Sequence, residues 1–118
     1  MGNPRKANGN ARRKAVAWLR SQGLECAECH RPIDYSLPAR DPMAFEVDEC
    51  VPVSRYWCRA WNDQRKCWAG PYQSAEQAAL AVENLRATHR ICNERKGNAL
   101  PGERKAANAA IVKSRSSY

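Results

Sequence analysis

Two short pairs of potential metal ligands, far apart in the sequence, constrain this chain most strongly. Cys26 and Cys29 form a C-x-x-C pair, and His89 and Cys92 form an H-x-x-C pair, with 59 residues between the two pairs. Thiolate and imidazole groups in two close pairs match the four ligands of tetrahedral Zn²⁺. We therefore predict a structural zinc site, with His89 and Cys92 on one face of a helix. A redox-active C-x-x-C pair is the alternative, but the sequence lacks the βαβ pattern that accompanies such a pair.

The rest of the sequence offers little from which to build a hydrophobic core. Val, Ile, Leu and Phe account for 16 of 118 residues, and the formal net charge is +8, a combination typical of disordered chains. A small domain of this composition needs a metal or disulfide bonds to stabilise its fold. We expect the four tryptophans to supplement the core, with stacking on exposed bases as the alternative.

The charged residues are distributed unevenly along the chain. Residues 1–20 contain six cations and no acid, residues 95–118 contain six cations and one acid, and residues 21–94 contain eight cations and eleven acids. Basic ends around an acidic centre favour a core that holds a cation, flanked by arms that lie along phosphates. Solubility alone is the alternative explanation of the basic ends.

The sequence also indicates a compartment. No stretch approaches eighteen apolar residues, and residues 1–20 lack the apolar core of a secretory signal. We therefore predict a cytoplasmic protein with no membrane partner, whose cysteines are metal ligands or free thiols. Cys50 is expected to be a small buried hydrophobic residue, and Cys58 and Cys67 to be free thiols. A secreted protein stabilised by disulfide bonds is the remaining alternative.

Hydrophobic periodicity and capping signals predict an α+β fold with short elements. Helices are expected over residues 11–22, 75–82, 88–96 and, in a basic tail, 103–113; a strand is expected over 44–55, with an interruption at Pro52. The Pro-rich stretch 24–43 is expected to be a knuckle followed by a loop, and residues 56–73 to be irregular.

Three sequence blocks link this chain to a known family. They are C-x-x-C from Cys26, V-D-x-x-V-P-V-S-R from Val47, and N-L-R-x-x-H-x-x-C-N-x-x-K-G from Asn84. In this order they resemble the HNH endonucleases, especially the small phage-type enzymes with a zinc-stapled ββα-metal motif. The resemblance covers residues 24–98 and implies a small, treble-clef-like ββα-metal core with an insertion at 56–83. An N-terminal helix or arm at 1–23 and a basic helical tail at 99–118 would flank this core.

The resemblance also implies roles for single residues. Asp48 falls on the family's metal-binding aspartate, and Asn93 falls on the position of the second metal ligand. Asn84 falls on the middle asparagine, which in the family fixes the loop and the catalytic strand through hydrogen bonds. Oxygen ligands such as these suit Mg²⁺ or Mn²⁺, so the catalytic ion would be distinct from the structural zinc.

Glu49 is the main departure from the family pattern, because it stands where the family has its general-base histidine. Glutamate is a weaker base than histidine near neutral pH. We expect Glu49 to act as the base or to orient the attacking water, with metal ligation and a purely structural role as alternatives. The exchange of His for Glu also leaves a rival function open, a non-catalytic zinc module that binds DNA or a packaging partner.

The function implied by the resemblance is that of a divalent-metal-dependent endonuclease that hydrolyses DNA phosphodiester bonds. One site in one chain favours nicking, and contacts to phosphates rather than bases predict weak sequence preference and strong salt dependence. The expected phosphate contacts are Arg55, Arg86, Arg90, Arg95 and Lys96. Small phage enzymes of this kind often act with the terminase during genome packaging, which would place the protein in the host-cell cytoplasm.

Overall fold

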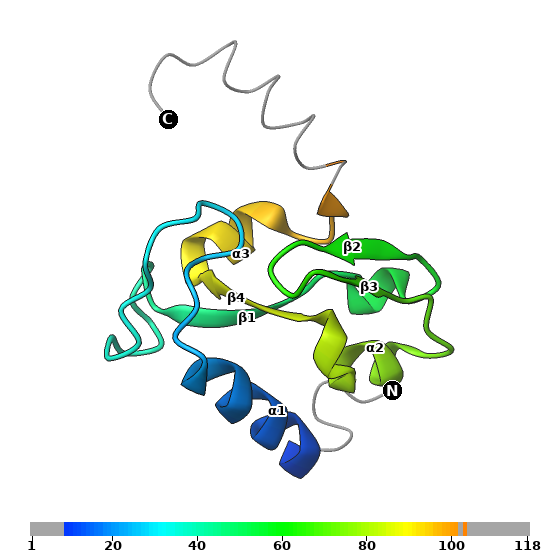
Figure 1. Ribbon diagram of the computed structural model, residues 1–118, viewed down its shortest axis with the longest axis horizontal. Coiled ribbons are helices and arrows are strands. Elements are labelled where there is room, and N and C mark those ends of the chain that lie inside the picture. The colour runs from blue at the N-terminus through cyan, green and yellow to red at the C-terminus, as the bar shows by residue number, and fades with distance from the viewer. Residues whose placement is uncertain (1–8, 102, 104–118) are drawn as a thin grey trace.

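An antiparallel pair of strands lies at the centre of the fold, with a helix on either side (Figure 1). β1 (Phe45–Glu49) pairs with β4 (Leu85–His89), and the helix α3 (Arg90–Lys96) follows β4 directly. The register places Asp48 opposite Arg86. These elements come from a computed structural model that describes residues 9–101 and 103. The pairing brings two of the three sequence blocks side by side.

The predicted α+β class is confirmed: residues 9–101 contain three α-helices and two small antiparallel sheets. The helix α1 (Gly9–Ser21) covers the strand pair on the side opposite α3 (Figure 1). It buries Ala15 and Leu19, which lie four residues apart on one face. Gly23, at a φ of +62°, turns the chain away from this helix toward the cysteine pair.

The chain between β1 and β4 forms a group of short elements. These are the 3₁₀ helix η2 (Val53–Arg55), the strands β2 (Ala60–Asn62) and β3 (Cys67–Ala69), the helix α2 (Ala75–Leu80) and the 3₁₀ helix η3 (Val82–Asn84). β2 and β3 form an antiparallel hairpin. The Nδ2 group of Asn62, which is fully buried, donates a hydrogen bond to the Glu83 carbonyl at 2.9 Å. This bond fixes the hairpin to the segment that enters β4.

Two small hydrophobic clusters stabilise the fold. The buried residues of the first are Ala15, Leu19, Cys26, Ile33, Leu85, Ala87 and Cys92; those of the second are Cys50, Val51, Ala60 and Ala69. Most of these side chains are small, so the apolar area that each removes from water is modest. The sparse core predicted from composition is therefore observed, and the predicted burial of Cys50 is confirmed.

The structure corrects the predicted boundaries of several elements. Residues 85–89 form a strand, so His89 ends β4 and precedes the helix that was expected to contain it. The predicted strand 44–55 ends at Glu49: the Val51 N–H bonds to the Asn84 side chain instead of a strand backbone, and Pro52 has no N–H to donate. The predicted irregular stretch 56–73 contains the β2–β3 hairpin.

The tryptophans do not supplement the core, which corrects the prediction made from composition. All four are exposed: Trp18 by 42%, Trp57 by 61%, Trp61 by 41% and Trp68 by 54%. Side chains alternate between the two faces of a strand. Because Ala60, Asn62 and Ala69 occupy the inward positions of the hairpin, its two tryptophans point to solvent.

Several predictions concern the ends of the chain. Residues 1–8 of the predicted arm, most of the predicted tail and all but residue 103 of the predicted helix 103–113 lie outside the described residues. Within residues 9–101, no helix combines the length and the apolar character needed to cross a membrane.

Candidate metal centre and adjoining cleft

Four predicted zinc ligands come together between the knuckle and the start of α3. The ligand atoms of Cys26, Cys29, His89 and Cys92 all lie within 4.8 Å of one another. His89 Nδ1 is 3.3 Å from the Cys29 sulfur and 3.9 Å from the Cys92 sulfur. Zn–S and Zn–N bonds of about 2.3 and 2.0 Å in a tetrahedron would separate such atoms by about 3.5 Å. This Cys₃His group could therefore hold a structural zinc ion.

The contacts around the four ligands orient them in a way that suits binding of a cation. His89 Nε2 lies 3.0 Å from the Pro32 carbonyl, a contact that places the ring hydrogen on Nε2 and leaves Nδ1 facing the sulfurs. The backbone N–H of His89 points at the Cys26 sulfur, 3.4 Å away. Burial, together with the neighbouring Cys26 and Cys29 sulfurs, raises the pKa of the Cys92 thiol to about 12. Binding of a cation would offset this crowding and release a proton.

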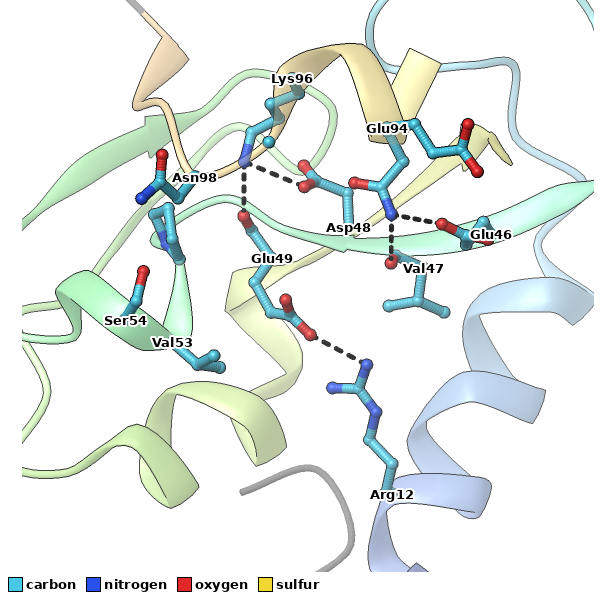
Figure 2. A pocket seen from close by; sticks show the side chains of 13 residues that line it. Arg12, Glu46, Val47, Asp48, Glu49, Val53, Ser54, Glu94, Lys96 and Asn98 are labelled. Atoms are coloured by element: carbon cyan, nitrogen blue, oxygen red, sulfur yellow. Dashed lines mark hydrogen bonds and ion pairs between the residues drawn. The ribbon is translucent and has the colours of Figure 1, made fainter. Parts of the chain in front are cut away.

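A cleft of about 640 Å³ opens between β1, α3 and the N-terminal part of α1. Figure 2 shows its lining side chains, which include the acids of β1, the polar residues of α3 and Arg12 from α1. Three of the catalytic residues implied by the family resemblance line it, namely Asp48, Glu49 and Asn93. The cleft therefore brings together residues that are separated by more than forty positions in the sequence.

Asp48 is buried and surrounded by cations. Its Oδ2 accepts hydrogen bonds from Arg86 Nε at 2.9 Å and Arg86 Nη2 at 2.7 Å, and its Oδ1 lies 3.0 Å from Lys96 Nζ. None of the three side chains is more than 4% exposed. Burial alone would lower the pKa of Arg86, but the adjacent Asp48 carboxylate raises it above its ordinary value. Both oxygens of Asp48 are thus occupied by charges of the chain itself.

Glu49, at the end of β1, is held by the first helix. Its Oε2 accepts a hydrogen bond from Arg12 Nη2 at 2.9 Å, and its side chain is 7% exposed. Arg12 also donates to the Ala79 carbonyl, so one guanidinium joins α1, β1 and α2. Figure 2 shows the two side chains approaching each other across the cleft. Arg12 was not among the predicted site residues, because its place on a cationic helix face gave no sign of this contact.

Asn93 extends from α3 toward β1. Its Nδ2 donates to Glu46 Oε1 at 2.8 Å and to the Val47 carbonyl at 3.2 Å. The Asn93 Oδ1 atom is the group on this side chain that can ligate a metal. Glu46 is a further acid of the cleft that the motif comparison did not single out. Its position two residues before Asp48, on the same face of β1, is the signal that could have identified it.

Asn84 makes four hydrogen bonds to the backbone of other segments. It is fully buried; its Oδ1 accepts from Val51 N at 2.7 Å, and its Nδ2 donates to the carbonyls of Val51 and Ala78, each at 2.9 Å. Its backbone carbonyl accepts from Cys50 N at 2.7 Å. These bonds fix the segment that follows β1, which is the loop-fixing geometry that the resemblance implied for this position.

Replacing Asn84 by alanine is expected to lower the free energy of unfolding by roughly 2–3 kcal/mol, because buried groups of Val51 and Ala78 would lose their hydrogen-bond partner. Urea unfolding of zinc-loaded protein measures the loss. Asn98→Ala is the matched control, since this asparagine is exposed and lines the cleft. Equal stabilities of the two variants would contradict the role assigned to Asn84.

Two of the five cations predicted to contact phosphate occupy interior positions. Arg86 and Lys96 pair with Asp48, and Arg86 also pairs with Glu28 at 2.7 Å. Their charges are balanced inside the protein, so in this structure neither side chain reaches an external phosphate. Sequence position alone could not show this, because an arginine in a strand can face either side of the sheet.

The other three cations lie nearer the surface. Arg55 pairs with Glu103 at 2.6 Å, Arg90 pairs with Glu94 at 3.1 Å, and Arg95 is exposed on α3. Pairs at such exposed sites contribute little to stability and exchange readily. Phosphate contact by these three residues stays a prediction.

Comparison with known proteins finds no match to this chain among family models, curated proteins or solved structures.

Proposed function

We propose that this protein is a divalent-metal-dependent endonuclease of the HNH type that nicks DNA. The observation that carries the proposal is the cleft, which is lined by Asp48 and Glu49 of β1 and by Asn93 of α3, whose amide donates to the neighbouring acid Glu46. β1 pairs with β4, and α3 follows β4 directly; this order of strand, strand and helix is the one expected of a ββα-metal core. The Cys₃His group lies where β4 joins α3, so a zinc ion bound there would support the position of Asn93.

Four residues of the cleft have a proposed task. Asp48 and Asn93 would hold Mg²⁺ or Mn²⁺, which stabilises the charge that develops on a phosphodiester during hydrolysis. For this, Asp48 must exchange the ammonium of Lys96, which lies on its Oδ1, for the metal ion. Glu49 would accept a proton from the attacking water, and Arg12 would hold the Glu49 carboxylate in place.

The second candidate is a zinc-stabilised module that binds DNA or a packaging partner without cleaving. It is favoured by one observation, the occupation of both Asp48 oxygens by Arg86 and Lys96. A carboxylate that serves only to neutralise two buried cations needs no metal ion. The two candidates differ in whether Glu49 and Asn93 take part in DNA cleavage or only stabilise the fold.

Plasmid nicking by a small set of variants tests the proposal. Glu49→Gln is expected to slow Mg²⁺- or Mn²⁺-dependent nicking by about 10²- to 10⁴-fold, the usual contribution of a general base. Asn93→Ala is expected to abolish metal-dependent cleavage. Glu94→Gln is the matched control and should cleave at the wild-type rate, because this exposed acid at the rim of the cleft pairs with Arg90. Wild-type nicking rates in the first two variants, with zinc retained, would contradict the roles assigned to Glu49 and Asn93. Absence of nicking by folded wild-type protein would favour the binding module.

A further inference from the structure

The outer face of the β2–β3 hairpin carries an aromatic and cationic surface, formed by Arg59, Trp61 and Trp68. The two tryptophans are directly opposite in the strand register, and their rings meet edge to face with centroids 5.4 Å apart. The Arg59 guanidinium lies 3.9 Å above the Trp68 ring centroid. All three side chains are exposed. We call these residues the hairpin surface.

The hairpin surface is held rigidly from beneath. Asn62 bonds to the Glu83 carbonyl, and Gln64 in the turn donates to the Glu25 carbonyl at 2.8 Å and accepts from Ala87 N at 2.8 Å. Ala60 and Ala69 pack inward against the second hydrophobic cluster. Two large aromatic side chains are thus kept in water on a fixed support, although burial would stabilise each of them. Such exposure marks an interaction surface.

Two arginines lie over tryptophan rings near the hairpin. Within residues 9–101 and 103, neither Arg59 nor Arg65 is in an ion pair, and each guanidinium instead lies over a tryptophan ring. Arg65, in the hairpin turn, lies 4.3 Å from the ring centroid of Trp18 on α1. The nearby Lys66 is paired with Asp63 at 2.7 Å. A partner that carries negative charge and presents flat apolar faces would complement both the arginines and the tryptophan rings of this region.

We infer that the hairpin surface binds unpaired nucleotides of a nucleic acid. A single strand supplies both parts of the complement, because its bases stack on aromatic rings and its phosphates face the guanidiniums. A duplex keeps its base faces inside the stack and could engage only the arginines. The formal net charge of +8 favours the same class of partner. This inference goes beyond the proposed nuclease activity, since binding here needs neither the cleft nor cleavage.

Fluorescence anisotropy with zinc-loaded full-length protein tests the inference, without added Mg²⁺ or Mn²⁺ so that cleavage plays no part. A labelled oligo-dT of about 20 nucleotides is expected to bind more tightly than a duplex of equal length. Trp68→Ala and Trp61→Ala should each weaken binding by roughly 5- to 150-fold, the range measured for loss of a stacked base. Trp68→Phe keeps an aromatic face and should retain most of the wild-type affinity for oligo-dT.

Trp57→Ala is the matched control and should bind as the wild type does. Its ring is exposed in the same insertion but packs edge to face on Tyr56, outside the hairpin surface. Equal binding of oligo-dT by wild type, Trp61→Ala and Trp68→Ala would overturn the inference. So would tighter binding of poly-glutamate or of anionic phosphatidylserine vesicles through the same two tryptophans, which would assign the surface to an acidic protein or to a membrane. Failure of nicking would leave these binding results intact.

Discussion

Cys26→Ser is expected to leave the protein without a stable fold at 25 °C. Cys26 is fully buried in the first hydrophobic cluster, and its sulfur faces the other three members of the Cys₃His group. Zinc contributes about 10–16 kcal/mol in small structural sites, which equals or exceeds the whole stability of a typical domain. The clusters observed here consist mostly of small side chains and cannot replace that contribution. Far-UV circular dichroism and the zinc content of the purified variant measure the effect.

Cys67→Ser is the control for this prediction, because Cys67 lies on β3, apart from the Cys₃His group. It should bind zinc and fold as the wild type does. Removal of zinc from the wild type by a strong chelator should reproduce the effect of Cys26→Ser. A Cys26→Ser protein that unfolds at the wild-type urea concentration without bound zinc would show that the metal has no structural role.

Asp48→Asn is expected to lower the free energy of unfolding by about 3–5 kcal/mol, even with zinc bound. The substitution keeps the shape of the side chain but removes the negative charge that balances Arg86 and Lys96, both of which are buried. A buried cation without its counter-charge is strongly destabilising. Urea unfolding of zinc-loaded protein gives the loss directly.

Glu28→Gln provides the comparison, since Glu28 contacts the same arginine at 2.7 Å from a more exposed position. This substitution should lower the free energy of unfolding by less than about 1 kcal/mol. Similar stabilities of Asp48→Asn and the wild type would contradict the prediction, because they would mean that water or an ion balances the charges of Arg86 and Lys96. The prediction also affects how the nuclease is tested: a variant at Asp48 can lose activity by unfolding, so Glu49 and Asn93 are the better positions.

The ligand set and the α+β class could be predicted because both depend on local sequence patterns. Cys26, Cys29, His89 and Cys92 stand in two close pairs, and any fold that joins the pairs brings all four together. The role of Asn84 in fixing the loop after β1 was likewise implied by its position in the third block, and its hydrogen bonds agree with it.

The environment of Asp48 could not be predicted, because it depends on strand register. Arg86 is opposite Asp48 only because β1 and β4 pair antiparallel with that offset. β4 itself was not predicted, and the predicted helix 88–96 overlaps its last two residues. All five residues of β4 are buried, so no alternation of polar and apolar residues revealed the strand.

The exposure of the tryptophans has a similar explanation. Composition suggested that large aromatic residues belong in a core that lacks aliphatic ones. Whether Trp61 faces inward depends on the hairpin, and the hairpin follows from a pairing of two three-residue strands that propensity does not reveal. Ala60 and Ala69 occupy inward positions of the hairpin and are part of the second cluster.

Plasmid relaxation by zinc-loaded wild-type protein, with and without added Mg²⁺ or Mn²⁺, tests the proposed nuclease most directly. We predict conversion of supercoiled to nicked DNA that requires the added metal, weakens steeply with salt and disappears in Asn93→Ala protein that retains its zinc. Absence of nicking by the folded wild type in both metals would contradict the proposed activity and leave the zinc-stabilised binding module as the account of this fold.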